Sequence, residues 1–390
     1  MFTFLIFIAV LALLVLSHEF GHFIVARRNG IQVDEFGFGF PPRLLGIRRI
    51  TTDSGRRWQI IWNKQQLKDT MAHHTGTIYS VNLIPLGGFV RIKGENPDDV
   101  GAYDADSFFT KKPWQKMAVV AAGVMMNFLL AAVLLSVGYM IGMPDNSGAS
   151  NGTRTLQVMQ TIPGKPAETA GIKTGDKILK VDEVSNPTVE EFQTYVNNHR
   201  DSEIAFTIEE NGQTKVLKIK PAALEGTNRA GIGVEIVDIS FIKYPWYRAI
   251  YEGVVSAGKY LVMIFAGLWF LITQLFHGTT PEGAVAGPVG VAVLTGAAAK
   301  LGFAYLLQFT ALLSLNLAAL NILPIPALDG GRLAFIIWSK LTRRPVTPRV
   351  EQVVHTVGFV LLMLLVVVIT VKDVGTFGGT ISAWWSHLIH

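Results

Sequence analysis

The chain has 390 residues, of which 50% are hydrophobic and 16% are charged, with a mean hydropathy of +0.37. Soluble domains carry about 25% charged residues, so the composition is that of a membrane protein rather than a soluble enzyme. The net charge of +5 does not indicate a nucleic-acid-binding protein, because the basic residues cluster beside apolar segments.

The first 26 residues are apolar except for three ionisable side chains, His18, Glu19 and His22. An ionisable group at membrane depth costs about 2.5 kcal/mol or more and is usually functional. Spaced as H-E-x-x-H on a helix, the two histidines share a face and can hold one zinc ion, with the glutamate beside it. The segment therefore predicts a metal-dependent hydrolase that works below the lipid surface.

Four segments have the roughly 20 apolar residues that a membrane-spanning helix needs. They are residues 3–26, 115–142, 303–323 and 353–371. The first lacks a basic start and a small-residue cleavage site, so we expect a retained helix rather than a signal peptide.

The stretch 74–95 predicts β-structure between the first two spans. TIYSVNLI and GFVRIKG are rich in β-branched and aromatic residues and read as two strands with a turn at Pro85, Gly87 and Gly88. Their apolar character predicts that they dip toward the membrane, where non-helical backbone must be covered by protein or face water.

Residues 155–222 have a soluble composition. TLQVMQTI, EIAFTIEE and TKVLKIKP predict strands, and TVEEFQTYVNN predicts an amphipathic helix around 188–198. In AETAGIKTGDKILKVD, a helical turn runs into Gly171, and Gly175 with Asp176 turns into a further strand. We expect a compact domain of about 70 residues, small but able to fold alone.

Positive charge determines the expected topology. Basic residues crowd 27–113 and the loop 324–349, so both should face the cytoplasm. This places 155–222 outside and requires that 246–277 does not cross but lies as an amphipathic helix in the outer interface. A fifth span is the alternative interpretation of 246–277, because its apolar run is long.

Catalytic zinc sites use three protein ligands, so His18 and His22 need a partner. The chain has no cysteine, and Asp329 is the candidate, at the end of the run NILPIPALDGG. Pro324 and Pro326 end the helix there, and the topology puts Asp329 at the depth of the histidines. The alternative role of Asp329 is an ordinary helix cap before GRLAFIIW.

HEFGH at 18–22, NILPIPALDGG at 321–331 and the soluble insert together resemble the site-2 protease family of intramembrane zinc metalloproteases, in its bacterial RseP type. IPLGGFVRIKGE at 84–95 is similar to the family's membrane re-entrant β-loop. AAGVMMNF at 121–128 is similar to its second-helix motif, although Val124 replaces a proline. The insert resembles a PDZ domain, used either to capture a peptide end or as a size filter.

The expected fold class is a polytopic α-helical membrane protein of about four transmembrane helices, with a membrane re-entrant β-hairpin or sheet and an inserted extracytoplasmic α+β PDZ domain. The expected order is a first transmembrane helix with HExxH (1–27), a cytoplasmic-side loop with membrane-associated strands (28–113), a second transmembrane helix (114–143), the PDZ domain (150–225), a linker strand and interfacial amphipathic helix (226–300), a third transmembrane helix with the NxxPxPxLDG run (301–332), and a cytoplasmic loop, fourth transmembrane helix and tail (333–390).

The resemblance assigns roles residue by residue. His18, His22 and Asp329 match the zinc ligands, and Glu19 matches the catalytic residue. The positions it places near the substrate are Asn127, Asn316, Pro324, Pro326, Gly87, Gly88, Phe89 and Val90. For Asn127 and Asn316, interhelical hydrogen bonding is the alternative.

The partners that the resemblance implies are the lipid bilayer, a possible peptide ligand of the PDZ domain, and single-span membrane proteins as substrates. These are cut within or near the transmembrane segment, on the cytoplasmic side of the cell (inner) membrane, as for an anti-sigma factor or a remnant signal peptide.

Two other function classes stay open at this point. A membrane-anchored PDZ adaptor would bind protein tails and do no chemistry. A zinc transporter or sensor would use the same ligands, but 115–142 and 353–371 offer no further acidic or histidine side chain beyond His355. We expect the histidines outside HExxH, His355 included, to be solvated or interfacial.

Overall fold

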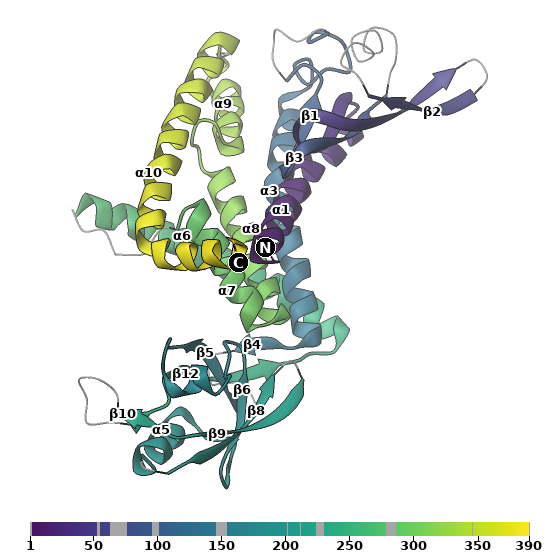
Figure 1. The fold of residues 1–390 in the computed structure, drawn as a ribbon. Helices are drawn as coiled ribbons and strands as arrows, with labels where there is room; N and C mark the ends of the chain where they lie inside the picture. The colour runs from purple at the N-terminus through teal and green to yellow at the C-terminus, as the bar shows by residue number, and fades with distance from the viewer. Residues whose placement is uncertain are drawn as a thin grey trace. The chain divides into compact units, whose positions relative to one another are not determined.

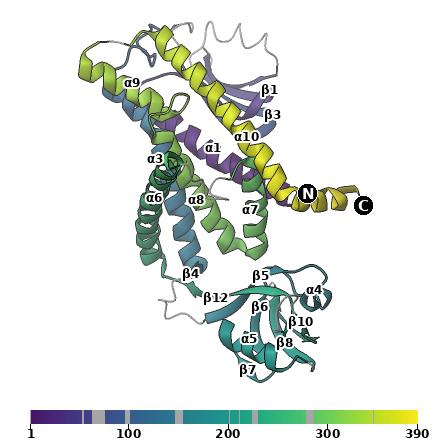
Figure 2. The same cartoon turned by 90° about the vertical axis from the view of Figure 1, so that its left-hand side faces the viewer.

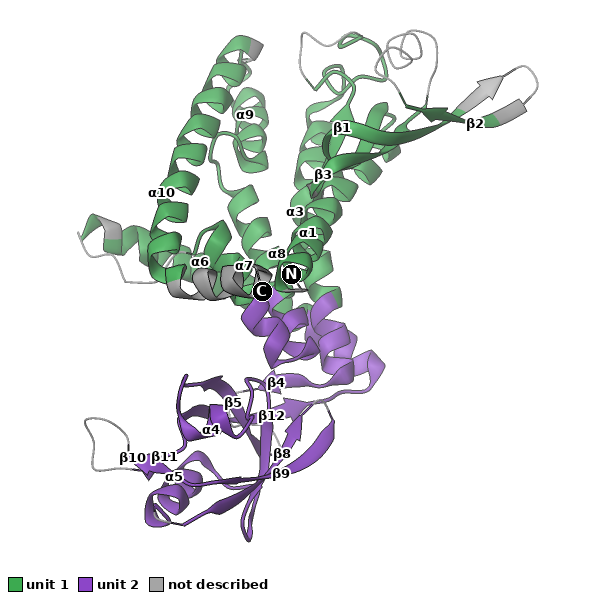
Figure 3. Ribbon diagram, viewed as in Figure 1, with its two compact units in different colours: residues 1–133, 254–295, 310–390 green, residues 134–253, 296–309 purple. Residues whose placement is uncertain are grey.

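The computed structural model describes residues 2–52, 55–62, 76–95, 101–145, 154–200, 202–210, 212–223, 230–277, 286–344 and 346–389. The chain divides into two compact units (Figure 3). Unit 1 comprises residues 1–133, 254–295 and 310–390, and unit 2 comprises residues 134–253 and 296–309.

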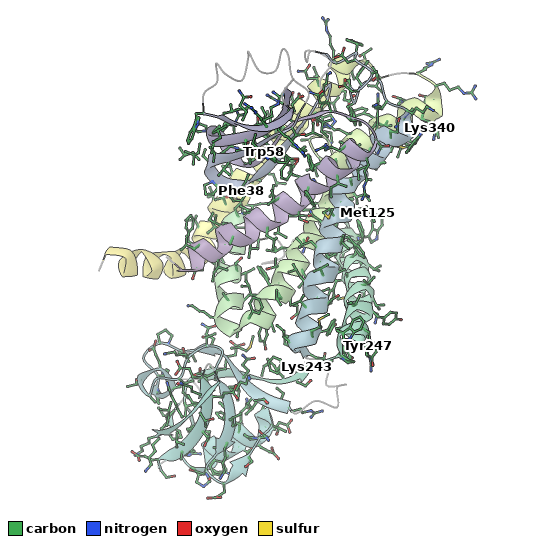
Figure 4. All side chains as sticks on the ribbon, turned by 90° about the vertical axis from the view of Figure 1, so that its right-hand side faces the viewer. Phe38, Trp58, Met125, Lys243, Tyr247 and Lys340 are labelled. Carbon is green, nitrogen blue, oxygen red and sulfur yellow. The ribbon has the colours of Figure 1, made fainter. Side chains whose placement is uncertain are left out.

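Five helices in the described residues are long and apolar enough to cross a membrane. They are α1 (Phe2–Arg28), α3 (Pro113–Ile141), α6 (Trp246–Phe276), α8 (Phe303–Ile322) and α10 (Pro348–Ile389) (Figure 1). Four match the predicted spans, and α6 is the segment predicted to lie in the interface. Large apolar side chains stand exposed on these helices, such as Met125 of α3 at 62% (Figure 4), as on faces that meet lipid.

The predicted break after the third span is confirmed. Proline lacks the N–H that continues a helix, and its ring clashes with the preceding turn. Accordingly α8 ends at Ile322, ahead of Pro324 and Pro326, and α9 (Asp329–Thr342) begins after the short irregular loop 323–328. The other short helix of this part of the chain, α7 (Pro288–Leu301), precedes α8.

Unit 1 contains a three-stranded sheet in the order β2-β1-β3, formed by β1 (Val33–Thr52), β2 (Gly55–Ile61) and β3 (Ile78–Ile92). The first part of β1 pairs with both halves of β3, since Phe36 is opposite Val90 and also opposite Tyr79. Helix α1 lies against β3 (Figure 1), and the core between them includes Phe23, which is 8% exposed. Burying such a ring contributes about 1.5–3 kcal/mol.

The predicted turn within 74–95 is confirmed by the pairing. Residues 78–81 run beside 35–38 in the same direction and residues 88–91 run in the opposite direction, so β3 turns back between these two halves. The glycines at this turn also allow close packing. A Cβ on Gly87 would lie 2.9 Å from Val15 Cγ1, and one on Gly88 would lie 3.4 Å from Leu16 Cδ1, both on α1. These residues therefore let the strand approach the helix that carries His18 and His22.

Unit 2 is built on a sheet in the order β4-β12-β5-β6-β8-β9, with β7 paired to β6 and a separate β10-β11 pair. Its elements are β4 (Met143–Asp145), β5 (Arg154–Thr161), α4 (Pro166–Thr169), β6 (Lys177–Val181), β7 (Val184–Ser185), α5 (Val189–Asn198), β8 (Ile204–Glu210), β9 (Gln213–Ile219), β10 (Ala222–Ala223), β11 (Ala230–Gly231) and β12 (Val234–Ile242) (Figure 2).

The strands and the helix predicted in 155–222 are present as β5, β6, β8, β9 and α5. Thr188 and Glu191 form a capping box that starts α5, and Phe192 and Val196 are buried on its inner face. The sheet also takes in β4 and β12, which lie beyond the predicted domain range of 150–225. Both limits of that range fall outside the described residues.

The β8–β9 hairpin carries an acid-sensitive ion pair. Lys173 Nζ lies 2.7 Å from Glu210 Oε1, and Lys215 contacts the other oxygen. The hydrogen bonds from both lysines lower the pKa of Glu210 to about 2. Since the unfolded pKa is about 4.3, the stabilisation is complete above that pH and is lost as pH falls toward 2.

We therefore expect Glu210→Gln to lower the thermal unfolding midpoint at neutral pH and to match wild type only below about pH 2, where Glu210 becomes protonated in the folded protein. Circular dichroism of the two proteins across this pH range measures the difference. Salt should shrink it at neutral pH, because both lysines are at least half exposed. A constant offset at every pH would show that the charge is not the cause.

Candidate metal centre

Helix α1 places His18 and His22 one turn apart, and the first residue of α9 faces them. Asp329 Oδ2 lies 3.1 Å from His18 Nε2 and 3.3 Å from His22 Nε2. The two Nε2 atoms are 3.2 Å apart. The predicted convergence of Asp329 with the histidine pair is thus present in the geometry.

The donor set fits a zinc ion. The three ligand atoms lie within 4.8 Å of one another, and this is the group of metal-ligating side chains found within the described ranges. His22 Nδ1 lies 2.8 Å from the Val119 carbonyl, to which its N–H donates, so the lone pair of Nε2 faces Asp329. Asp329 Oδ2 is buried and has no hydrogen-bond partner among the residues that the structure describes. Two imidazoles and one carboxylate are a donor set typical of catalytic zinc sites, which keep a fourth position for water.

The helix-cap interpretation of Asp329 does not apply. The N-cap of α9 is Leu328, which makes no side-chain cap bond, and Asp329 is the first residue within the helix. Its carboxylate points to the imidazoles rather than to the first-turn N–H groups.

Helix α3 closes over the histidines at two glycines. A Cβ on Gly123 would lie 2.4 Å from His22 Nε2 and 2.5 Å from His18 Cε1. A Cβ on Gly21 would lie 2.3 Å from the Ala122 carbonyl oxygen. Small residues let membrane helices approach closely, and here they bring α3 against the candidate ligands.

Glu19 lines the same cavity as the three candidate ligands, which has a volume of about 210 Å³. The other residues of its wall are Phe89, Val90, Ile92, Glu95, Phe108, Val119, Val120 and Arg332. The Glu19 carboxylate accepts a hydrogen bond from the backbone N–H of Val90 on β3. The acid next to the histidines is therefore also next to the edge of the sheet.

Several wall residues were not predicted. Arg332 follows Asp329 by three positions, so helical spacing could have placed it on the same face of α9. The Arg332 guanidinium contacts Glu95. Glu95 and the apolar wall residue Phe108 come from distant segments, and no motif predicted either as a wall residue. Gly123 is not a wall residue, but its contact with the histidines was also not predicted. The glycine in the helix segment AAGVMMNF was a signal of close helix packing.

The residues predicted near the substrate have different surroundings. Asn127 is fully buried, and its Nδ2 lies 3.4 Å from His18 Nδ1. Asn316 is exposed on α8 and donates to the Leu312 carbonyl. Pro324 is exposed, whereas Pro326 is half-buried.

The four predicted residues of the β-segment divide into two pairs. Phe89 and Val90 line the cavity. Gly87 and Gly88 are buried against α1.

A match to peptidase family M50 covers residues 6–62 and 65–365. The chain belongs to this family. It is 32% identical to a candidate zinc metalloprotease of Clostridium acetobutylicum, over 95% of this chain and 97% of the relative. It is 27% identical to zinc metalloprotease RasP of Oceanobacillus iheyensis, over 96% and 99% of the two chains, and 28% identical to RasP of Geobacillus kaustophilus, over 95% and 97%.

Membership of the M50 family confirms the predicted enzyme class. The chain is a zinc metalloprotease, and with its apolar helices it is a multi-pass membrane protein. A solved PDZ domain of an SdrC-like protein from Listeria monocytogenes is similar to 21% of this chain and covers 86% of that chain, at 22% identity and a TM-score of 0.20. That likeness is too limited to assign the fold of unit 2.

Proposed function

We propose that this protease cuts peptide bonds within or near the transmembrane segment of single-span membrane proteins, with zinc held by His18, His22 and Asp329. The observation that carries the proposal is the convergence of these three donors beside Glu19, with both histidines and Glu19 on a helix long enough to cross a membrane. An adaptor without chemistry would have no need of this arrangement.

Zinc, when bound, supplies Lewis acidity and lowers the pKa of a coordinated water toward about 7. Glu19 then acts as the general base, taking a proton from the attacking water on its carboxylate oxygen. It returns that proton to the nitrogen of the leaving amine. Val119 holds His22 in the required tautomer through its carbonyl oxygen.

Asn127 is proposed to orient His18. As a zinc ligand through Nε2, His18 carries its proton on Nδ1 and needs an acceptor there. The amide oxygen and nitrogen of Asn127 have the same shape, and the side chain turned by 180° presents Oδ1 to that proton. Ser314 donates to the Asn127 backbone carbonyl at 2.8 Å, which joins α8 to this part of α3.

The last strand of the sheet is proposed to bind the substrate. A helical substrate hides its carbonyl groups in its own hydrogen bonds and must be extended before cleavage. β3 is terminal in the order β2-β1-β3, and its residues Phe89 and Val90 line the cavity. An extended substrate can add to this edge, which would satisfy its backbone groups at membrane depth.

The proposed topology places the metal centre toward the cytoplasmic side of the cell (inner) membrane and the PDZ-like unit outside. The basic residues of 27–113 and of the loop 324–349 support this, because both segments fall on the same side of the membrane if α6 lies in the outer interface. The PDZ-like unit would exclude substrates that still carry bulky outer domains. Substrates shortened by another protease, such as an anti-sigma factor or a remnant signal peptide, fit these requirements.

Reconstitution in liposomes with a single-span substrate tests the proposal. We expect the wild-type protein to cleave the substrate. Cleavage should stop after dialysis against a chelator and return when zinc is added. His22→Phe and Asp329→Ala are expected to lose bound zinc as well as cleavage. Full activity of both variants without metal would refute the ligand set.

A further inference from the structure

Helix α10 contacts the loop before Asp329 at two places one helical turn apart. Most of this helix is exposed, and only 6% of its most apolar window is buried. His355 and Gly358 are exceptions, because both meet the loop 323–328. A Cβ on Gly358 would lie 2.4 Å from Pro326 Cβ, so only glycine allows this approach.

His355 makes a specific bond to this loop. The backbone N–H of Ala327 donates to His355 Nδ1 at 2.9 Å. Ala327 has a φ of +75°, a left-handed conformation that a residue with a Cβ rarely adopts unless its surroundings hold it. The imidazole therefore holds a peptide in a conformation that the loop does not favour by itself.

The orientation of the ring supports a dedicated role. Because Nδ1 accepts a hydrogen bond, a neutral imidazole carries its proton on Nε2. That nitrogen is buried and has no hydrogen-bond partner in the described part of the chain. A buried donor without a partner is unfavourable. The ring keeps this orientation because its Nδ1 accepts the hydrogen bond from Ala327.

Asp329 follows Ala327 by only two residues, so fixing the Ala327 peptide also limits where the Asp329 backbone can lie. On the opposite side the loop folds back on the start of α9, where a Cβ on Gly331 would lie 2.5 Å from the Ile325 carbonyl oxygen. Phe335 of α9 also contacts the His355 ring, with centroids 5.8 Å apart. The loop is thus fixed between α9 and α10.

We propose that His355 is a positioning residue of the protease, which holds the Ala327 peptide and thereby sets the Asp329 carboxylate against His18 and His22. This rests on the proposed role of Asp329 as a zinc ligand. His355 is not itself a ligand, since its Nδ1 is occupied by the Ala327 N–H and it lies outside the three-residue donor group.

Two substitutions separate the hydrogen bond from the bulk of the ring. His355→Asn keeps an acceptor, because Oδ1 is attached to Cγ as Nδ1 is, whereas His355→Leu has none. Zinc affinity is measured by chelator competition on the purified full chain, and cleavage is measured with the reconstituted substrate. We expect His355→Leu to lose at least about tenfold in zinc affinity and in kcat, as for other residues that orient a ligand, with little change in KM. His355→Asn should stay near wild type.

Gly358→Ala provides a second route, since it leaves the imidazole in place and pushes Pro326 away; it should lower zinc affinity too. Val357→Ala is the control on α10, because Val357 is 53% exposed, and it should behave as wild type. Wild-type zinc affinity in His355→Leu overturns the proposal, and equal losses in His355→Leu and His355→Asn overturn its hydrogen-bond basis.

Asp329→Ala shows whether a negative result refutes the positioning role of His355 or the proposed zinc ligands. If Asp329→Ala keeps zinc, the ligand set itself is wrong, whatever His355 does. If Asp329→Ala loses zinc while His355→Leu retains it, only the positioning role is wrong.

Discussion

Glu19→Gln is expected to leave zinc bound and to lower kcat by about 10²–10⁴-fold, the range that a general base contributes. The amide has nearly the shape of the carboxylate, so the cavity with His18, His22 and Asp329 stays filled. It cannot take a proton from water, which removes the acid–base step alone. Zinc content by mass spectrometry and single-turnover cleavage of a reconstituted substrate measure the two effects.

Glu183→Gln is the matched control, because the same chemical change falls on a side chain that is 98% exposed. It is expected to cleave as wild type. Loss of zinc in Glu19→Gln would instead mean that this carboxylate supports the metal, and unchanged cleavage would remove Glu19 from the mechanism.

Gly123→Ala is expected to damage the candidate metal centre without replacing a ligand. The added methyl carbon would lie 2.4 Å from His22 Nε2 and 2.5 Å from His18 Cε1, closer than non-bonded atoms approach. Either α3 moves away or the rings turn. Overpacking of this kind costs about 1–3 kcal/mol, and a displacement of about 1 Å at a reacting centre costs about 100-fold in rate. We expect weaker zinc binding and about a 100-fold loss of kcat/KM.

Gly267→Ala controls for the general effect of replacing a helical glycine. Gly267 lies in α6, and a Cβ there would meet nothing within 4 Å. Alanine favours a helix by about 1 kcal/mol over glycine, so this variant should be as stable as wild type or more so, with normal cleavage. Normal zinc affinity in Gly123→Ala would show that the helices adjust without cost to the site.

Features that depend on neighbouring residues were accessible from the sequence. Helical spacing placed His18 and His22 on one face, and the prolines predicted where α8 ends. The strands of unit 2 followed from their β-branched residues, and the start of α5 lies where TVEEFQTYVNN predicted it. Asp329 was reached less directly, from topology and membrane depth.

Contacts between distant segments were not accessible in this way. His355 was expected to be solvated or interfacial, but it accepts a bond from Ala327. Gly87 and Gly88 were interpreted as turn residues, but their close approach to α1 was not predicted, because it depends on where that helix lies.

By itself the sequence determined the membrane character, the pair of imidazoles with Glu19 between them, and the carboxylate available to complete them. Composition is sufficient for the membrane character, and local backbone geometry is sufficient for the imidazole pair, because side chains four residues apart on a helix meet whatever the rest of the chain does. The tertiary structure decided that Asp329 faces the pair, that Gly123 and Val119 close the site, and that α10 holds the loop. Such contacts depend on how helices far apart in the sequence pack together, which no local pattern of residues encodes.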